Sequence, residues 1–421
     1  MRKAKLFIAL ALFTGTAIAD SGPQWLAAGE SDLVATRLTS DISAIPASHH
    51  AESAAITFAW PATAERMEQQ TAPAIQAESR QYWIDATGSV LNRGLKLPLT
   101  APGAVIRISA LESGSELRLD PARMELAIDD QPLDRATVQD LVTGAQMRDQ
   151  GMMVPEDSLA FRLPADVDAR MLDVRLSGAP ADQALVVHVF EPNSEWTANL
   201  TAPRSNFLAG QPIDLAVRLS NGKQEFTIND VQALMVDPSA SRSFTMSRVD
   251  NGMGLSGEVP VNAIAAAPGL YEAHVYVNHN IGGTIIKRDL KLAFGIAPAA
   301  GRFNGEVSRM AGDDFALSLG VEVAAAGRYQ VNGEIYGTNQ FGHLQPLAFA
   351  QSAAVLNAGQ GQIALKVEAD TLATAGLSAP FEVRNLQLLD QGRMYLLEER
   401  QRAVLIDAVD QRRGPGHLIE R

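Results

Sequence analysis

The chain has 421 residues, no cysteine, and 35 Lys and Arg against 48 Asp and Glu, which gives a formal net charge of −13 at pH 7. A chain of this length is too long to fold around a single hydrophobic core, so two or three domains are expected. The lack of cysteine excludes disulfides, thiolate metal sites and cysteine nucleophiles. The negative charge argues against nucleic acid or anionic lipid as a partner.

Residues 1–19 have the pattern of a secretory signal peptide. Arg2, Lys3 and Lys5 precede the apolar run 6–13, and Ala17-Ile18-Ala19 supplies small residues at the positions that a signal peptidase reads. The run is too short to cross a bilayer, and no later run approaches the ~20 residues required. We therefore expect a protein exported by this signal, periplasmic or secreted, without a transmembrane segment.

Residues 20–80 are rich in Ala, Ser, Thr, Glu and Gln, which predicts an extended N-terminal segment that docks in places, near Trp25 and at ITFAWP (56–61). From residue 81 apolar and polar residues alternate in short runs bounded by Gly, Pro, Asn and Asp. The clearest of these runs are 104–111, 115–121, 124–129, 170–178 and 183–192. Alternation at roughly ten-residue spacing is typical of an antiparallel sandwich. This pattern predicts a β-rich N-terminal domain over 81–196.

One helix is expected in that domain, over Arg135–Met147. Val138, Leu141, Val142 and Ala145 recur at helical spacing there, and Asp134 is suited to cap the first turn.

Two further strand series follow, over 197–298 and 299–410, and the tail 411–421 has no pattern. Both series contain Gly-x-Tyr followed by alternation, at Tyr271 and Tyr329. In immunoglobulin-type sandwiches a tyrosine at the head of strand F hydrogen-bonds to backbone upstream. We therefore predict a structural role for Tyr271 and Tyr329. The fold class that follows is all-β, with the N-terminal sandwich-like domain and its short helix followed by two immunoglobulin-like β-sandwich domains.

The stretch YEAHVYVNHN (271–280) gathers polar groups that resemble an active site. In a strand, residues of one parity share a face. The odd positions are apolar apart from His279, and the even positions, with Glu272 and His274, are polar. His274 and His279 therefore lie on opposite faces of a regular strand and do not share an ion. The stretch is interpreted as a strand with one solvated face.

The inventory of catalytic and metal-binding motifs is short. The zinc helix, the phosphate loop and the nucleophile elbow are absent from the sequence. Two acidic groups are weak calcium candidates, Asp129, Asp130 and Asp134 in one, Asp250 and Asn251 in the other. Neither matches the EF-hand spacing, and both are typical of tight turns. His49-His50 is interpreted as a solvated pair, and no cofactor is expected. Trp25, Trp60, Trp83 and Trp196 are candidates for an aromatic platform or for core positions.

Four segments resemble a known family of exported bacterial proteins. They are VVHVFEPNSEW (186–196), APRSNFLAGQPIDLAVRL (202–219), APGLYEAHVYVN (267–278) and the stretch from AGRYQVNGEIYGTNQFG to PFEVRNLQLLD (326–390). Over roughly residues 81–408 the chain is similar to the family catalogued as domain of unknown function 4785. This resemblance implies a Gram-negative periplasmic or secreted protein with tandem immunoglobulin-like domains. Some relatives look like type II secretion cargo, and the family supplies no activity and no site residues.

The interpretation that follows is a non-catalytic binding or adhesion module for an extracytoplasmic protein or glycan partner. The alternative is a secreted hydrolase with its site in the first domain or at a domain junction. A structural or chaperone-like envelope component is a third possibility.

Overall fold

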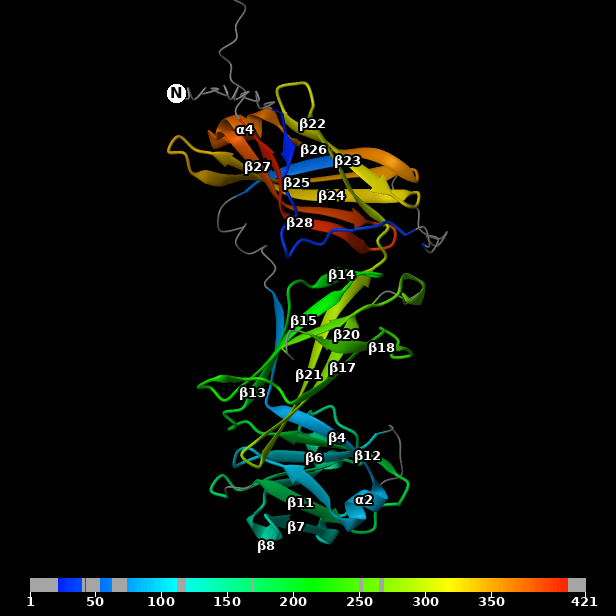
Figure 1. The fold of residues 1–421 in the computed structure, drawn as a ribbon, viewed down its shortest axis with the longest axis vertical. Helices are drawn as coiled ribbons and strands as arrows, with labels where there is room; N and C mark the ends of the chain where they lie inside the picture. Colours follow the sequence, from blue (N-terminus) through cyan, green and yellow to red (C-terminus); the bar gives the residue numbers. More distant parts are fainter. Residues whose placement is uncertain are drawn as a thin grey trace, which may run out of the picture.

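The computed structural model describes residues 22–39, 42, 54–62, 74–111, 119–167, 170–249, 253–264 and 269–407. Three β-rich domains lie in a row along the long axis of the molecule (Figure 1). The first domain occupies one end, the middle domain lies between, and the C-terminal domain occupies the other end. The all-β fold class is confirmed. Within the described residues, no helix has the length and hydropathy needed to span a membrane.

The first domain is a sandwich of two antiparallel sheets. The larger sheet contains β4 (Gln81–Thr87), β12 (Ala184–Phe190), β6 (Val105–Ala110), β10 (Leu159–Arg162) and β9 (Gln139–Thr143), in that order. The smaller contains β5 (Leu95–Pro98), β11 (Met171–Leu176), β7 (Met124–Ile128) and β8 (Gln131–Leu133). Alternation on β12 buries Leu185, Val187 and Val189 completely, because one face of each strand must pack against the other sheet. The predicted strand at 115–121 falls mostly outside the described residues.

The middle domain is one continuous ten-stranded sheet that encloses its own core. The path is β14 (Asn206–Leu208), β21 (Thr284–Ala297), β20 (Tyr271–Ile281), β17 (Asp230–Val236), β18 (Ser243–Val249), β19 (Gly254–Gly257), β15 (Ile213–Ser220), β13 (Thr197–Ala202) and β3 (Ile75–Ser79), with β16 (Glu225–Phe226) beside β15. The inward residues of β15, β17 and β20 form the centre of the hydrophobic core.

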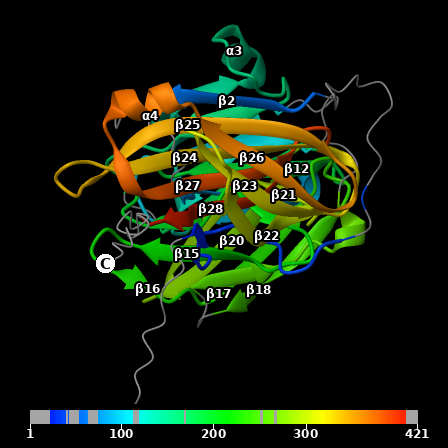
Figure 2. The same ribbon diagram turned by 90° about the horizontal axis from the view of Figure 1, so that it is seen from above.

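The C-terminal domain packs a six-stranded sheet against a three-stranded one. The six strands are β1 (Gln24–Trp25), β28 (Tyr395–Ile406), β27 (Ser378–Asp390), β24 (Gly327–Thr338), β25 (Leu344–Leu356) and β2 (Ile56–Pro61). The three strands are β22 (Gly301–Arg309), β23 (Phe315–Val323) and β26 (Gly359–Val367). Viewed from above, β2, β25, β24, β27 and β28 lie side by side in that order (Figure 2).

The N-terminal segment supplies strands to the two later domains before the first domain begins. β1 pairs with β28 and β2 pairs with β25, both in the C-terminal domain. β3 then pairs with β13 in the middle domain. The chain therefore passes along the C-terminal domain and the middle domain before β4 begins the first domain. This segment covers sheet edges formed by strands that lie much later in the sequence.

The helix predicted over Arg135–Met147 is wrong for most of its length. A 3-10 turn (Arg135–Thr137) comes first, capped by Asp134, whose side chain accepts a hydrogen bond from the Ala136 amide. β9 follows and pairs with β10, and only then does helix α3 (Gly144–Asp149) begin, with a capping box at its start. Pairing with β10 outweighs the local helical spacing. The domain also holds α2 (Gly88–Arg93), and the C-terminal domain holds α4 (Ala369–Ala375).

Candidate functional site

The histidine-rich stretch forms β20 and its faces are as predicted. Tyr271, Ala273, Val275 and Val277 are buried, whereas Glu272 and Tyr276 are exposed. The Nε2 atom of His274 lies 2.9 Å from a carboxylate oxygen of Glu272 on the same face of the strand. The two histidines lie on opposite faces, as the parity of the strand requires.

His279 is buried on the core side of β20. It is 7% exposed, and neither ring nitrogen has a hydrogen-bond partner. The ring packs beside Trp196 and Phe226, and burial lowers the pKa of His279. It therefore serves as a neutral core side chain.

The described calcium candidates serve separate turns. Asp129 and Asp130 both have positive φ in the hairpin between β7 and β8, a geometry that a tight primed turn requires. The Asp129 carboxylate accepts from the Met171 amide at 3.0 Å, and Asp130 pairs with Lys96 at 3.2 Å. Asp134 caps its 3-10 turn. Asp250 and Asn251 lie outside the described residues. Over the described part of the chain, no three His, Asp or Glu side chains are grouped to hold a metal ion.

Both predicted structural tyrosines lie in cores. Tyr271 is 1% exposed in the middle domain and Tyr329 is completely buried in the C-terminal domain. The Tyr329 hydroxyl donates a 2.7 Å hydrogen bond to the carbonyl of Ala325, four residues upstream. Burial raises the pKa of Tyr329 to about 12.

A buried polar network joins the first and middle domains. Arg288 on β21 forms a 2.8 Å ion pair with Glu191, and neither side chain is exposed. The same guanidinium donates to the hydroxyls of Thr100 and Ser194 at 2.9 and 2.8 Å. Arg288 and Glu191 are buried, and the groups satisfy one another. The network therefore joins two domains.

Trp83 forms a second contact at the same junction. Its indole ring stacks on His188 at 4.7 Å, and its backbone amide donates to Asp289 at 2.7 Å. Burial, with a contribution from Arg107, lowers the pKa of His188 to about 4. Burial raises the pKa of Asp289 to about 6. His188 is half-buried against Trp83, on the face of β12 opposite the buried Leu185, Val187 and Val189.

The candidate site is a row of aromatic rings on edge strand β2. Phe58 and Trp60 stack with ring centroids 6.0 Å apart, and Trp60 stacks on Phe349 of β25 at 5.8 Å. Phe58 is 54% and Trp60 is 44% exposed, although Ala59 between them packs on the core. Large apolar side chains left in solvent together on one edge mark interaction sites in soluble proteins.

On the outer face of the six-stranded sheet, polar side chains lie in the same cross-strand rows as these aromatic rings. Register places one row from β2 to β28 as Trp60, Phe349, Glu334, Arg384 and Arg402. The next row is Phe58, Gln351, Asn332, Gln387 and Glu399. Asn332 donates to Gln387 at 3.3 Å and Gln387 donates to Glu399 at 2.7 Å, so the amides form a ladder. This surface combines flat apolar rings with amide, carboxylate and guanidinium groups.

Two carboxylates on this face have pKa values shifted in opposite directions. Burial raises the pKa of Glu334, against hydrogen bonds from Asn385 and Tyr336. Burial also acts to raise the pKa of Glu382, but hydrogen bonds from Arg402 and Arg384 outweigh it and the pKa is lowered. Two carboxylates whose pKa values are shifted in opposite directions are found in the catalytic acid–base pairs of enzymes. Here both oxygens of Glu382 accept from guanidinium groups, which makes it an ion-pair partner and a poor nucleophile.

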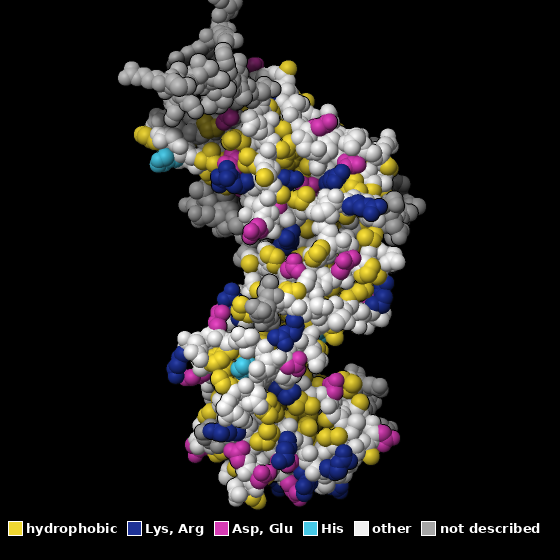
Figure 3. All heavy atoms as spheres, viewed as in Figure 1, with side chains coloured by type: hydrophobic (Ala, Val, Ile, Leu, Met, Phe, Trp, Pro, Cys, Tyr) yellow, Lys and Arg dark blue, Asp and Glu magenta, His cyan; other side chains and the backbone are white. Residues whose placement is uncertain are grey.

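Only part of this face could be found in the sequence. Trp60 was one of four tryptophan candidates, and the other three pack against neighbours: Trp25 on Phe303, Trp83 on His188 and Trp196 on Phe226. Phe349 and the amide ladder gave no sequence signal, because cross-strand pairing brings them together from distant segments. Over the side of the molecule seen in Figure 3, charged groups of both signs are interspersed.

Two family models match the chain. The N-terminal domain model of the domain of unknown function DUF4785 matches residues 47–191, and the C-terminal domain model matches residues 300–407. No curated protein matches. A crystal structure of a DUF4785 family protein from Legionella pneumophila superposes with a TM-score of 0.66 at 16% identity, covering 91% of this chain and 99% of that one. That likeness shows the fold alone.

Squid arrestin aligns at 11% identity over 50% of this chain and 94% of its own. Its TM-score of 0.16 is too low to indicate a shared fold. The two DUF4785 models, in contrast, belong to one family and together cover more than half of the chain. This protein therefore belongs to the DUF4785 family.

Proposed function

We propose that this protein is an exported glycan-binding module that holds a carbohydrate chain on the outer face of its six-stranded sheet. The main support for the proposal is the stacked row of exposed Phe58 and Trp60 with half-buried Phe349, beside the amide ladder. Export by the N-terminal signal would bring this face into contact with envelope or extracellular polysaccharide.

The chemistry of the face favours a sugar over a peptide. Pyranose rings present flat C–H faces that pack on aromatic rings, and their neighbouring hydroxyls pair with groups that both donate and accept. Each carboxamide of Gln351, Asn332 and Gln387 has two N–H donors and two acceptor lone pairs, so capacity remains after the bonds within the ladder are made. A peptide that added a strand to β2 would use backbone groups at the edge and would not need the ladder.

Affinity electrophoresis and isothermal titration with a panel of soluble polysaccharides test the proposal. Trp60→Ala and Phe58→Ala should each weaken binding roughly tenfold or more, the scale of an aromatic anchor at an interface. Phe341→Ala is the matched control, because Phe341 is 75% exposed away from this row. Absence of saturable binding to every polysaccharide, or equal losses in the control, would refute the proposal.

Release of new reducing ends distinguishes the hydrolase alternative in the same samples. A binding module releases none over hours. Hydrolysis that disappears in Glu334→Gln, with binding retained, would establish an enzyme and would assign Glu334 as its acid.

A further inference from the structure

A pocket of about 310 Å³ lies where the N-terminal segment crosses the junction of the middle and C-terminal domains. Thr36, Arg37 and Thr39 line it from the N-terminal segment, Ala209 and Gln211 from the loop after β14, and Val261 from a 3-10 turn. The volume is at the lower end of the range of roughly 300–1,000 Å³ that small-molecule sites occupy.

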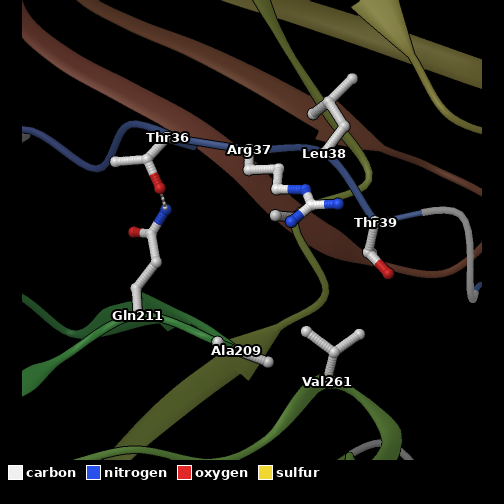
Figure 4. A pocket seen from close by; sticks show the side chains of 9 residues that line it. Thr36, Arg37, Leu38, Thr39, Ala209, Gln211 and Val261 are labelled. Carbon is white, nitrogen blue, oxygen red and sulfur yellow. Dashed lines mark hydrogen bonds between the residues drawn. The ribbon is translucent and has the colours of Figure 1, made fainter.

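The guanidinium of Arg37 extends into this space above Ala209 and Val261, with the Thr39 hydroxyl on one side and Gln211 on the other (Figure 4). The Gln211 amide donates to the Thr36 hydroxyl at 3.1 Å, which fixes the far wall. Among the described residues that line the pocket, none is acidic. Among the described residues, none forms an ion pair with Arg37, whereas many of the other described arginines have a carboxylate partner.

We infer that this pocket binds a small molecule through an oxyanion, a carboxylate or a phosphate group, held by Arg37. A guanidinium can donate two parallel hydrogen bonds to the two oxygens of such a group. A guanidinium without a carboxylate partner in a concave site can donate these bonds to a ligand. Val261 with Ala209 forms an apolar floor for the uncharged part. The site is separate from the aromatic row and does not depend on the proposed glycan function.

Binding at this place would bridge three parts of the chain. The ligand would contact the N-terminal segment, the middle domain and, through Ala299, the connection into the C-terminal domain. It would therefore stabilise the folded protein in proportion to its concentration.

Isothermal titration and thermal melting of the full-length chain test the inference, with glucuronate, inorganic phosphate and uncharged glucose as probes. At least one anion should bind saturably, more weakly at high salt, and glucose should not. Arg37→Ala should weaken that binding about tenfold or more, and Arg37→Lys, which keeps the charge but loses the fork, should weaken it less. Arg309→Ala removes an exposed arginine elsewhere and should leave affinity unchanged.

Binding of glucuronate but not phosphate would identify the carboxylate, and the reverse would identify the phosphate. Failure of both anions to bind, equal binding of glucose and glucuronate, or an unaltered affinity in Arg37→Ala would overturn the inference. Trp60→Ala serves as an independent arm, because it should change polysaccharide binding and leave anion binding intact.

Discussion

The guanidinium of Arg288 and the carboxylate of Glu191 lie 2.8 Å apart, and both side chains are completely buried between the first and middle domains. They are 97 residues apart in sequence: Glu191 directly follows β12 of the first domain, and Arg288 lies on β21 of the middle domain. Desolvation offsets much of the attraction within a buried ion pair, but removing one partner leaves the other charge buried and uncompensated, at a cost of several kcal/mol. We therefore expect that breaking this pair weakens the docking of the two domains.

Arg288→Met should lower the free energy of unfolding by about 3–5 kcal/mol, because Glu191 would stay buried without a partner. Urea denaturation monitored by tryptophan fluorescence measures the change. Arg218→Ala, which breaks an exposed ion pair with Glu225, is the matched control and should cost less than about 1 kcal/mol. Adding Glu191→Gln to Arg288→Met should recover part of the loss. Equal stability of Arg288→Met and the parent protein would contradict a role for the pair in docking.

His188, which stacks on the Trp83 ring, and Asp289, which accepts from the Trp83 amide, should make opposite contributions to the pH dependence of stability. The pKa of His188 is about 4 when folded and about 6.5 when unfolded, so its contribution is present above pH 6.5 and is lost as pH falls toward 4. The pKa of Asp289 is about 6 when folded and about 3.9 when unfolded, so its contribution is present below about pH 4 and is lost as pH rises through 6.

Between pH 7 and 4 the two contributions offset each other, each on the order of 3 kcal/mol. Asp289→Asn should therefore make the protein lose stability more steeply on acidification, and His188→Gln should make it lose less. Urea midpoints at four or five pH values show the slopes. Identical slopes in both variants and the parent would show that neither group titrates at the junction.

Tyr329→Phe should lower stability by about 1 kcal/mol or more, because the Ala325 carbonyl would lose its 2.7 Å hydrogen bond at a part-buried position. The same loss is predicted for Tyr271→Phe in the middle domain. Thermal melting of both variants measures the effect, and Tyr276→Phe, at a tyrosine 38% exposed, is the control. Unchanged melting of both core variants would exclude the structural role predicted for these tyrosines.

Leu33→Ala should cost about 2–5 kcal/mol, the usual range for truncating a buried leucine. Leu33 is 2% exposed and packs with Leu208 and Ala297 of the middle domain, while its backbone bonds to Glu399 of β28. The N-terminal segment therefore fastens two domains at this point. Leu270→Ala, at a leucine 59% exposed, should change stability by less than about 0.5 kcal/mol. A small effect of Leu33→Ala in calorimetry would mean that the segment docks without stabilising the later domains.

Local alternation was sufficient to predict which face of β12 and of β20 is buried. On β12 and β20 the inward positions follow directly from period two, because neighbouring side chains of a strand point to opposite sides. The helix predicted over Arg135–Met147 failed because the apolar spacing there fits both a helix and a strand followed by a turn. Only the presence of β10 as a pairing partner decides between them.

The all-β class, alternating strands such as β12 and β20, and the family resemblance could be predicted from the sequence, since these depend on residues close together in the chain. Three features required the tertiary structure: the N-terminal segment adds β1 and β2 to the C-terminal sheet, Phe349 extends the row of Trp60, and Arg37 lies in one pocket with Gln211. Strand pairing uses backbone groups that are the same in every residue, so a single sequence does not specify which distant edge a strand will join.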